Sequence, residues 1–288
     1  MRAEAITRAL GGKWFGRNGI ACCPAHDDRS PSLSIADGEA SRVLLYCHAG
    51  CDYDDVERAV RDQLAGHSPT AEHDQIVGKT TVGTAPSNVH LVSKIWDATV
   101  SIEGTLAEDY LRSRSIMCDL PETLRFHSAL RHPTECSLPA MTALVQRTDG
   151  NQLGLHRTFL GPHRPVKSRL QPSKAMLGPC KGGAVRLRTG NSGLIVCEGI
   201  ETGLSLCGGT ESDFAVWAAL STSGVKGLRL PEPRQFNASL VVAMDGDLPG
   251  RKAGSELAQR AAAAGWMVET VSAPEGLDFN DVARGKEA

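Results

Sequence analysis

The sequence predicts a multi-domain α/β protein, with a mixed α+β part in its middle and a small parallel sheet flanked by helices at its C-terminal end. Two observations predict this class. After residue 190, apolar strand-like segments alternate with helical ones, which is typical of a parallel sheet. Before that point, the strand-like segments 139–147 and 152–160 are joined by TDGN, which indicates a hairpin.

The chain divides into four predicted parts. Residues 1–65 are the richest in Cys and His and end in a charged helical pattern. Residues 66–88 are rich in Gly, Ser, Thr and Pro, as in a linker. Residues 89–190 open with one long helical pattern (92–114) ahead of the hairpin, and residues 191–288 hold the alternating elements. In that last part the expected strands are 194–198, 214–220, 239–245 and 267–272, and the expected helices are 199–209 and 251–265.

Charge is unevenly distributed along the 288 residues. The whole chain carries −2, but residues 111–190 hold thirteen Lys or Arg and four acids, a net +9. Residues 1–110 carry −6 and residues 191–288 carry −5. A basic segment between two acidic ones predicts a surface that faces a polyanion, beside a part that binds cations. The alternative is an ordinary solvated basic surface.

The sequence contains no sign of a membrane segment. No stretch approaches the ~20 consecutive apolar residues of a membrane span, and the N-terminus lacks the apolar core of a signal peptide. We therefore expect a cytoplasmic protein with no membrane partner. Nine cysteines in such a chain are expected to be thiols or metal ligands rather than disulfides.

Two closely spaced pairs of metal-binding residue types lie near the N-terminus. Cys23 and His26 form the first pair, and Cys47 and Cys51 form the second, with a predicted hairpin between the pairs. This spacing is typical of a closed tetrahedral zinc site, whose role is structural because no coordination position stays open. Such a site would supply folding energy to a small module. Cys22 and His48 are near enough in sequence to replace one of the four.

Carboxylates follow three of the predicted C-terminal strands. Glu198 follows the first, Asp245 and Asp247 follow the third, and Asp278 and Asp281 come after the last. Parallel strands bring their carboxyl ends to one sheet edge, where open α/β sheets bind ligands. Aspartates one residue apart repel each other unless a cation lies between them, and hard oxygen ligands suit magnesium. The alternatives are a solvated Asp-Gly turn and a helix cap at Glu198.

The segment CPAHDDRSPSLSI followed by LLYCHAGC resembles the zinc-binding domain of bacterial, phage and plasmid primases. In that family a Cys-x2-His pair, a Pro-Ser pair and a later Cys pair form a zinc ribbon that contacts template DNA. The second pair here has three intervening residues where bacterial chromosomal primases usually have two, and this spacing resembles the phage and plasmid branch.

The segments VCEGIETGLSL, AMDGDLPGRKAG and PEGLDFNDV resemble, in the same order, the Toprim domain of primases, topoisomerases and some nucleases. The resemblance implies that Asp245 and Asp247 hold magnesium, and that Glu198 is a proton acceptor or a further ligand. Bacterial primases often have an acid four residues after that glutamate, where this chain has Thr202. Glu201 lies one residue earlier, and its role is left open.

The basic stretch LHRTFLGPHRPVKSRLQPSKAMLGPCKGG resembles the segment that precedes Toprim in primases and lines the groove for template and nucleotide. This likeness nominates four residues for phosphate or template contact: Arg157, Lys167, Arg169 and Lys174. Each could equally be a solvated surface residue.

Together these features predict a DNA primase of phage or plasmid type that makes short RNA primers on single-stranded DNA from nucleoside triphosphates. Its expected cofactors are structural zinc and catalytic magnesium, or manganese in its place, with Glu198, Asp245, Asp247 and Asp278 as ligands. The sequence contains no phosphate-loop motif, so a separate replicative helicase is expected. The alternatives are a Toprim nuclease and a non-catalytic single-strand-binding or helicase-loading protein.

Overall fold

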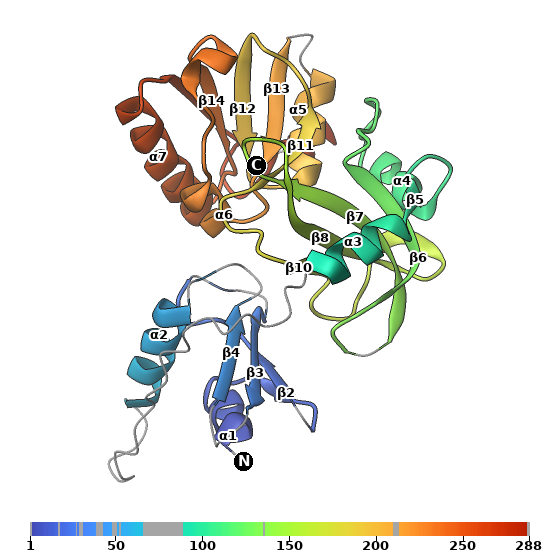
Figure 1. The fold of residues 1–288 in the computed structure, drawn as a ribbon, viewed down its shortest axis with the longest axis vertical. Coiled ribbons are helices and arrows are strands. Elements are labelled where there is room, and N and C mark those ends of the chain that lie inside the picture. The colour runs from blue at the N-terminus through green and yellow to red at the C-terminus, as the bar shows by residue number, and fades with distance from the viewer. Residues whose placement is uncertain are drawn as a thin grey trace. The chain divides into compact units, whose positions relative to one another are not determined.

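The computed structural model forms two compact units, residues 1–86 and 87–288 (Figure 1). It describes residues 2–16, 18–26, 28, 31–38, 43–47, 51, 53–65, 89–134, 136–209 and 213–286. The predicted linker, 66–88, lies outside the described residues. Among the described residues, no helix combines the length and the apolar character needed to cross a membrane.

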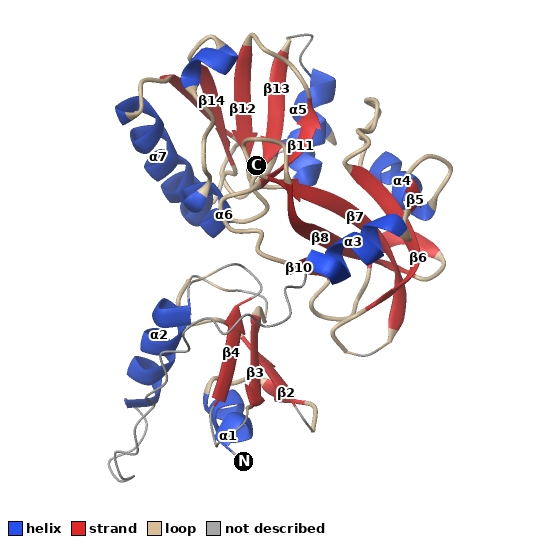
Figure 2. Cartoon of the chain, viewed as in Figure 1, coloured by secondary structure: helices blue, strands red, loops and turns tan. Residues whose placement is uncertain are grey.

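The first unit is a four-stranded antiparallel sheet with helices packed against it (Figure 2). Its elements are α1 (Arg2–Ala9), β1 (Lys13–Trp14), β2 (Asn18–Ala21), β3 (Leu33–Asp37), β4 (Val43–Cys47) and α2 (Tyr53–Ala65). The hairpin expected between the two ligand pairs is β3 and β4, which pair in antiparallel register. Helix α2 buries Val56 and Val60, one turn apart, against Leu33 and Ile35 of the sheet.

The second unit contains one eleven-stranded sheet in which the middle and C-terminal parts of the chain are continuous. The elements of its first half are α3 (Val89–Asp97), β5 (Val100–Ser101), α4 (Leu106–Ser113), β6 (Leu124–Arg131), β7 (Ser137–Gln146), β8 (Gln152–Gly161), β9 (Arg164–Lys167), β10 (Lys174–Leu177) and β11 (Ala184–Arg188). Strands β7 and β8 are the predicted hairpin. Strand β11 pairs antiparallel with β7 on one side and with β13 (Phe214–Ala218) on the other, so the sheet is mixed.

The long helical pattern predicted over 92–114 is two helices. Helix α3 ends at Asp97, and α4 begins at Leu106. Between them, Val100 and Ser101 form strand β5, which pairs with β6. Gly104 then adopts a left-handed backbone conformation (φ 68°), which a continuing helix does not allow. The prediction of one helix was therefore wrong at this turn.

The C-terminal part forms the predicted parallel strands, in the order β13-β12-β14-β15. Its remaining elements are β12 (Gly193–Cys197), α5 (Ile200–Gly209), α6 (Thr222–Gly227), the 3₁₀ helix η2 (Pro233–Phe236), β14 (Ser239–Met244), α7 (Leu248–Ala263), β15 (Met267–Ser272) and α8 (Phe279–Ala283). Helix α5 packs Leu204 into the core on one face of the sheet, together with Ile195. Helix α7 packs Leu257 into the core on the other face, together with Val196. The expected α/β architecture is confirmed.

Candidate active site and metal centre

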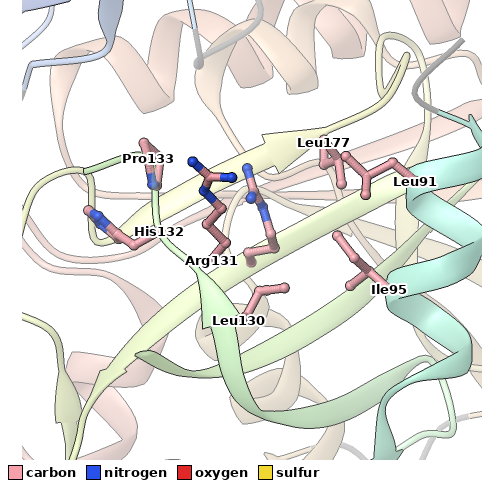
Figure 3. Close-up of a pocket in the computed structure, with 8 residues that line it drawn as sticks. Leu91, Ile95, Leu130, Arg131, His132, Pro133 and Leu177 are labelled. Atoms are coloured by element: carbon pink, nitrogen blue, oxygen red, sulfur yellow. The ribbon is translucent and has the colours of Figure 1, made fainter. Parts of the chain in front are cut away.

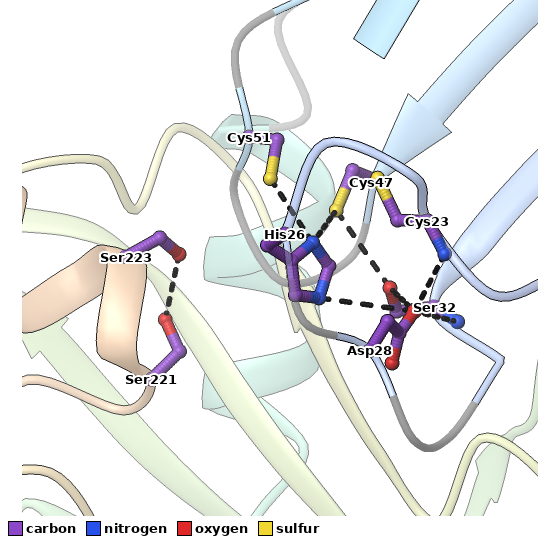
Figure 4. Close-up of polar contacts among 8 residues, drawn as sticks. All are labelled: Cys23, His26, Asp28, Ser32, Cys47, Cys51, Ser221 and Ser223. Carbon is purple, nitrogen blue, oxygen red and sulfur yellow. Dashed lines mark hydrogen bonds and ion pairs between the residues drawn. The ribbon is translucent and has the colours of Figure 1, made fainter. Parts of the chain in front are cut away.

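The four predicted zinc ligands lie together in the first unit. One ligand atom from each of Cys23, His26, Cys47 and Cys51 lies within 4.8 Å of the others. His26 Nδ1 lies 3.2 Å from Cys51 Sγ and 3.9 Å from Cys47 Sγ (Figure 4). Hydrogen bonds from Cys23 and Cys51 lower the pKa of the Cys47 thiol, which favours the thiolate that binds metals. Three thiols and one imidazole at this spacing form a Cys3His set, the donor chemistry of tetrahedral zinc sites.

Asp28 organises the loop around this cluster. Its Oδ2 accepts hydrogen bonds from the Cys23 backbone N–H (2.7 Å) and from the Ser32 hydroxyl (2.6 Å), and it lies 3.7 Å from His26 Nε2 (Figure 4). A carboxylate behind a ligating imidazole fixes the tautomer and the orientation of the ring. Asp28 was not among the residues predicted from the sequence, although it follows His26 by two positions.

Of the two alternative ligands, Cys22 lies in the described part of the chain. Cys22 is exposed, whereas its neighbour Cys23 is buried. His48 lies outside the described residues.

The predicted carboxylates lie at the carboxyl edge of the parallel strands. Glu198 directly follows β12, and Asp245 directly follows β14, which pairs with β12. The chain leaves β12 into α5 on one face and leaves β14 into α7 on the opposite face. Strands whose connections diverge in this way leave a crevice between their carboxyl ends, and ligands of open α/β sheets bind there.

Gly246 explains how an acid from the last loop reaches this edge. Its backbone N–H donates to Leu277 O (2.8 Å), and its carbonyl accepts from Gly276 N (3.1 Å). A Cβ atom at position 246 would overlap the backbone oxygen of Pro274. The glycine between the two aspartates therefore allows the 274–277 loop to approach, and this loop delivers Asp278 toward Asp245.

The acidic side chains interact electrostatically. Burial, reinforced by the charges of Asp245 and Asp247, raises the pKa of Glu198 to about 7. Burial, reinforced by Asp278 and Asp247, likewise raises the pKa of Asp245 to about 7. Asp245 Oδ1 is buried without a hydrogen-bond partner, whereas the Thr202 hydroxyl contacts the same carboxyl group. An orphaned buried carboxylate oxygen among other acids is a position that a cation can satisfy.

Two of these acids also cap helices. Asp247 Oδ1 accepts from Gly250 N at the start of α7, and Asp278 Oδ1 accepts from Asp281 N at the start of α8. Asp281 itself pairs with Lys286 at 2.6 Å. In the described part of the chain, no three acidic side chains come within the 4.8 Å mutual spacing of the cysteine cluster. We call the sheet edge that carries Glu198, Asp245, Asp247 and Asp278 the acidic edge. Magnesium keeps several water ligands, so this open edge can hold it without a tight cage.

The four nominated basic residues lie in different places. Lys167 of β9 and Lys174 of β10 both contact the carboxylate of Glu201. The charge of Lys174 also acts on Glu198 and Asp245, so this lysine lies beside the acidic edge.

Arg157 belongs to the opposite face of the sheet. It pairs with Ala175, whereas the neighbouring Thr158 pairs with Lys174, and side chains alternate between the two faces along a strand. Its guanidinium lies over the Phe159 ring and donates to Met176 O. Arg169 is exposed. Arg157 lines an open pocket of about 390 Å³ (Figure 3), together with Leu91, Ile95, Leu130, Arg131, His132, Pro133 and Leu177.

Glu201 is the residue whose role the sequence left open. It lies in the first turn of α5, is 4% exposed, and accepts a hydrogen bond from the Tyr110 hydroxyl (2.7 Å). Burial opposes its ionisation, but Lys174, Lys167 and Tyr110 together hold its pKa well below its usual range. Its partners come from α4, β9 and β10, and no sequence spacing could have indicated that these elements meet.

Comparison with known families divides the second unit at β12. Residues 193–288 match the Toprim domain family, and residues 87–187 match a domain of unknown function, DUF7146. No curated protein sequence matches the chain.

Several solved primase structures are similar to this chain. The Aquifex aeolicus primase (zinc-binding and RNA polymerase domains) is 17% identical over 98% of this chain and 79% of its own, with a TM-score of 0.43. The primase fragment of the bacteriophage T7 primase-helicase is 14% identical over 92% and 96%, with a TM-score of 0.40. A primase domain from Pseudomonas aeruginosa is 15% identical over 68% and 74%, with a TM-score of 0.43. At these identities and TM-scores the likeness by itself assigns no activity.

The match to the Toprim family agrees with the resemblance of the three sequence segments that contain Glu198, Asp245 and Asp278. The matched residues include the strands and loops that carry these three acids. The C-terminal third of the chain, residues 193–288, is therefore a Toprim domain.

Proposed function

We propose that the chain is a DNA primase that makes short RNA primers on single-stranded DNA by magnesium-dependent nucleotidyl transfer, in phage or plasmid replication. The observation that carries this proposal is the acidic edge of the Toprim domain, where two carboxyl groups have a pKa of about 7 and a lysine lies beside them. Glu198 and Asp245, with Asp247 and Asp278, are the proposed magnesium ligands, and manganese could replace the ion.

The reaction forms a bond between the 3′ hydroxyl oxygen of a growing primer and the α-phosphate of a nucleoside triphosphate, breaks the bond between the α- and β-phosphates, and releases pyrophosphate. When bound at this edge, magnesium would neutralise charge on the attacking and leaving oxygens. Glu198 supports proton transfer, because a carboxylate with a pKa of about 7 can accept a proton near neutral pH. Lys167 and Lys174, whose side chains are partly exposed, supply positive charge for the triphosphate.

The remaining parts of the chain fit a role in template binding. We propose that zinc bound by Cys23, His26, Cys47 and Cys51 folds the N-terminal module, which then contacts template DNA. The middle segment, with a net charge of +9 over residues 111–190, would attract the DNA backbone. Arg157, on the opposite face of the sheet from Lys174, and the exposed Arg169 are proposed as template contacts. Strand separation would come from a separate helicase.

The test is a primer-synthesis assay on circular single-stranded DNA with magnesium and labelled nucleotides. We expect short oligomers from the wild-type protein and none from Asp245→Ala. The matched control is Glu269→Gln, an exposed acid on β15 of the same domain, which should act like wild type. Degradation of the DNA without synthesis would instead identify a nuclease. DNA retention with neither activity would identify a binding protein.

A further inference from the structure

Glu201 anchors a buried polar cluster. Its Oε1 accepts from the Tyr110 hydroxyl (2.7 Å) and lies 2.9 Å from Lys167 Nζ, and its Oε2 lies 3.3 Å from Lys174 Nζ. The Lys167 ammonium also lies 5.9 Å from the centre of the Tyr110 ring. One carboxylate thus pairs with two ammonium groups, and the cluster carries one net positive charge.

The three charged side chains differ in how far they are exposed to solvent. The Glu201 side chain is 6% exposed, whereas those of Lys167 and Lys174 are 33% and 39% exposed. The carboxylate is therefore the most buried part of the cluster, and the two lysine side chains are partly exposed. A lysine fixed at its buried side can still present N–H donors to an anion that arrives from outside.

The cluster joins the two family segments of this unit. Tyr110, Lys167 and Lys174 belong to the DUF7146 segment, and Glu201 belongs to the Toprim domain. Within that domain, Glu201 lies one residue before Thr202, whose hydroxyl contacts Asp245. In the first turn of α5, Glu201 therefore contacts the two lysines, and the next residue, Thr202, contacts the acidic edge.

The surrounding charges show why the lysines need this carboxylate. Burial and the neighbouring Lys174 lower the pKa of Lys167, and Arg114 of α4 acts in the same direction. His156 of β8 adds no further positive charge near neutral pH, because burial, with the charge of Lys174, lowers its pKa to about 3. Without Glu201, the two ammonium groups would repel each other, and the carboxylates of the acidic edge would attract Lys174.

We propose that Glu201 is a positioning residue for nucleotide binding: its carboxylate fixes Lys167 and Lys174 side by side at the acidic edge, where they bind the triphosphate of the incoming nucleotide. Tyr110 orients that carboxylate through its hydroxyl. This inference rests on the proposed function in taking a nucleotide as the anion.

The test compares Glu201→Gln, which keeps the shape and loses the charge, with Glu201→Asp, which keeps the charge at a shorter reach. Calorimetry on the full chain measures the binding of magnesium ATP, and primer assays give KM and kcat for nucleotides. We expect Glu201→Gln to weaken magnesium ATP binding and raise KM at least tenfold, with a smaller change in kcat. Glu201→Asp should bind more tightly than Glu201→Gln. The control is Glu256→Gln, which removes a surface ion pair with Lys226 and should stay within twofold of wild type.

Each outcome decides the question. If folded Glu201→Gln binds magnesium ATP as tightly as wild type, or if wild type does not bind it, the inference is wrong. If Glu201→Gln does not fold, Tyr110→Phe replaces it as the test, because this substitution removes one hydrogen bond to Glu201 and no charge. We expect Tyr110→Phe to bind magnesium ATP about threefold more weakly. Unchanged binding would contradict the positioning role of Glu201. Weaker nucleotide binding by Glu201→Gln in a protein that makes no primers would overturn the proposed function alone.

Discussion

Asp247 Oδ1 accepts a hydrogen bond from the backbone N–H of Gly250 at 2.7 Å, so one oxygen of this carboxylate caps helix α7. The same side chain contributes to the raised pKa values of Glu198 and Asp245. Asp247 therefore has two separable tasks, one in the local fold and one in the electrostatics of the acidic edge.

Substitutions at Asp247 should separate these tasks. Asn caps helices as well as Asp does, so Asp247→Asn should keep its stability, whereas Asp247→Ala should lose about 1 kcal/mol. Both should lower primer synthesis by roughly 100-fold or more, because a lost metal ligand costs several kcal/mol of transition-state stabilisation. Urea denaturation and primer assays measure the two effects. Full activity in Asp247→Asn would mean that Asp247 is only a cap.

Removal of a zinc ligand should unfold the N-terminal module. The unit is small, and structural zinc contributes about 10–16 kcal/mol of binding free energy to such modules. We expect Cys47→Ser to lose zinc and the fold of the N-terminal module. The matched control is Cys22→Ser, an exposed cysteine outside the cluster, which should retain one zinc per chain. Metal analysis and circular dichroism distinguish the two, and equal zinc content in both variants would contradict the assigned ligand set.

Metal binding at the acidic edge should compete with protons. Because burial and neighbouring acids raise the pKa of Glu198 and of Asp245 to about 7, both carboxyl groups are largely protonated below that pH in the metal-free protein. Manganese binding must then release protons, and its affinity should fall about tenfold for each released proton per pH unit below 7. Calorimetry in buffers of different ionisation enthalpy counts the protons. An affinity that does not change between pH 8 and pH 6 would exclude this coupling.

His156 should make the second unit sensitive to acid. This side chain is 4% exposed, and burial, with the charge of Lys174, lowers its pKa from 6.5 to about 3. The unfolded chain therefore binds one more proton than the folded chain between these values, so stability is full above pH 6.5 and is lost as the pH falls toward 3. Between pH 7 and pH 5 the wild type should lose about 2 kcal/mol more than His156→Met. Urea denaturation at the two pH values measures this difference, and parallel losses would show that His156 does not titrate as expected.

A methyl group at Gly246 should displace the last acidic loop. The Cβ atom of Gly246→Ala would overlap Pro274 O, and the two backbone hydrogen bonds of this glycine hold the loop in place. We expect a loss of roughly 2–3 kcal/mol in stability, together with loss of manganese binding. The control is Gly209→Ala at the end of α5, where no atom lies within 4 Å of the added group. Equal stability of the two variants would show that the loop can move without cost.

Much of the site follows from local sequence patterns. The strand predicted over 239–245 forms β14, which ends one residue earlier at Met244, because the charged Asp245 ends the buried strand. The hairpin β7–β8 forms around the TDGN turn, where Gly150 adopts a positive φ of 86°. Cys and His spacing was likewise sufficient to identify the cluster in the first unit, because both pairs flank one hairpin.

What could not be predicted depends on contacts between distant segments. Glu201 meets Tyr110 across 91 positions and Lys174 across 27, and no periodicity encodes such distances. Strand β11 contains only five residues, and its pairing with both β7 and β13 is a tertiary property. Arg157 and Lys174 are both basic and lie on paired strands, but only the strand register shows that they occupy opposite faces.

The place of β11 in the sheet has a consequence for how a nucleic acid could be accommodated. A hinge at residues 188–193 would have to break the strand pairing that runs from β7 through β11 to β13, and buried backbone groups left without partners are costly. The two lysines, Lys167 and Lys174, and the carboxylates that follow β12 and β14 are thus attached to one continuous sheet. Any opening and closing around a template must come from loops and side chains, because the sheet fixes the distance between the lysine-bearing strands and the acid-bearing strands.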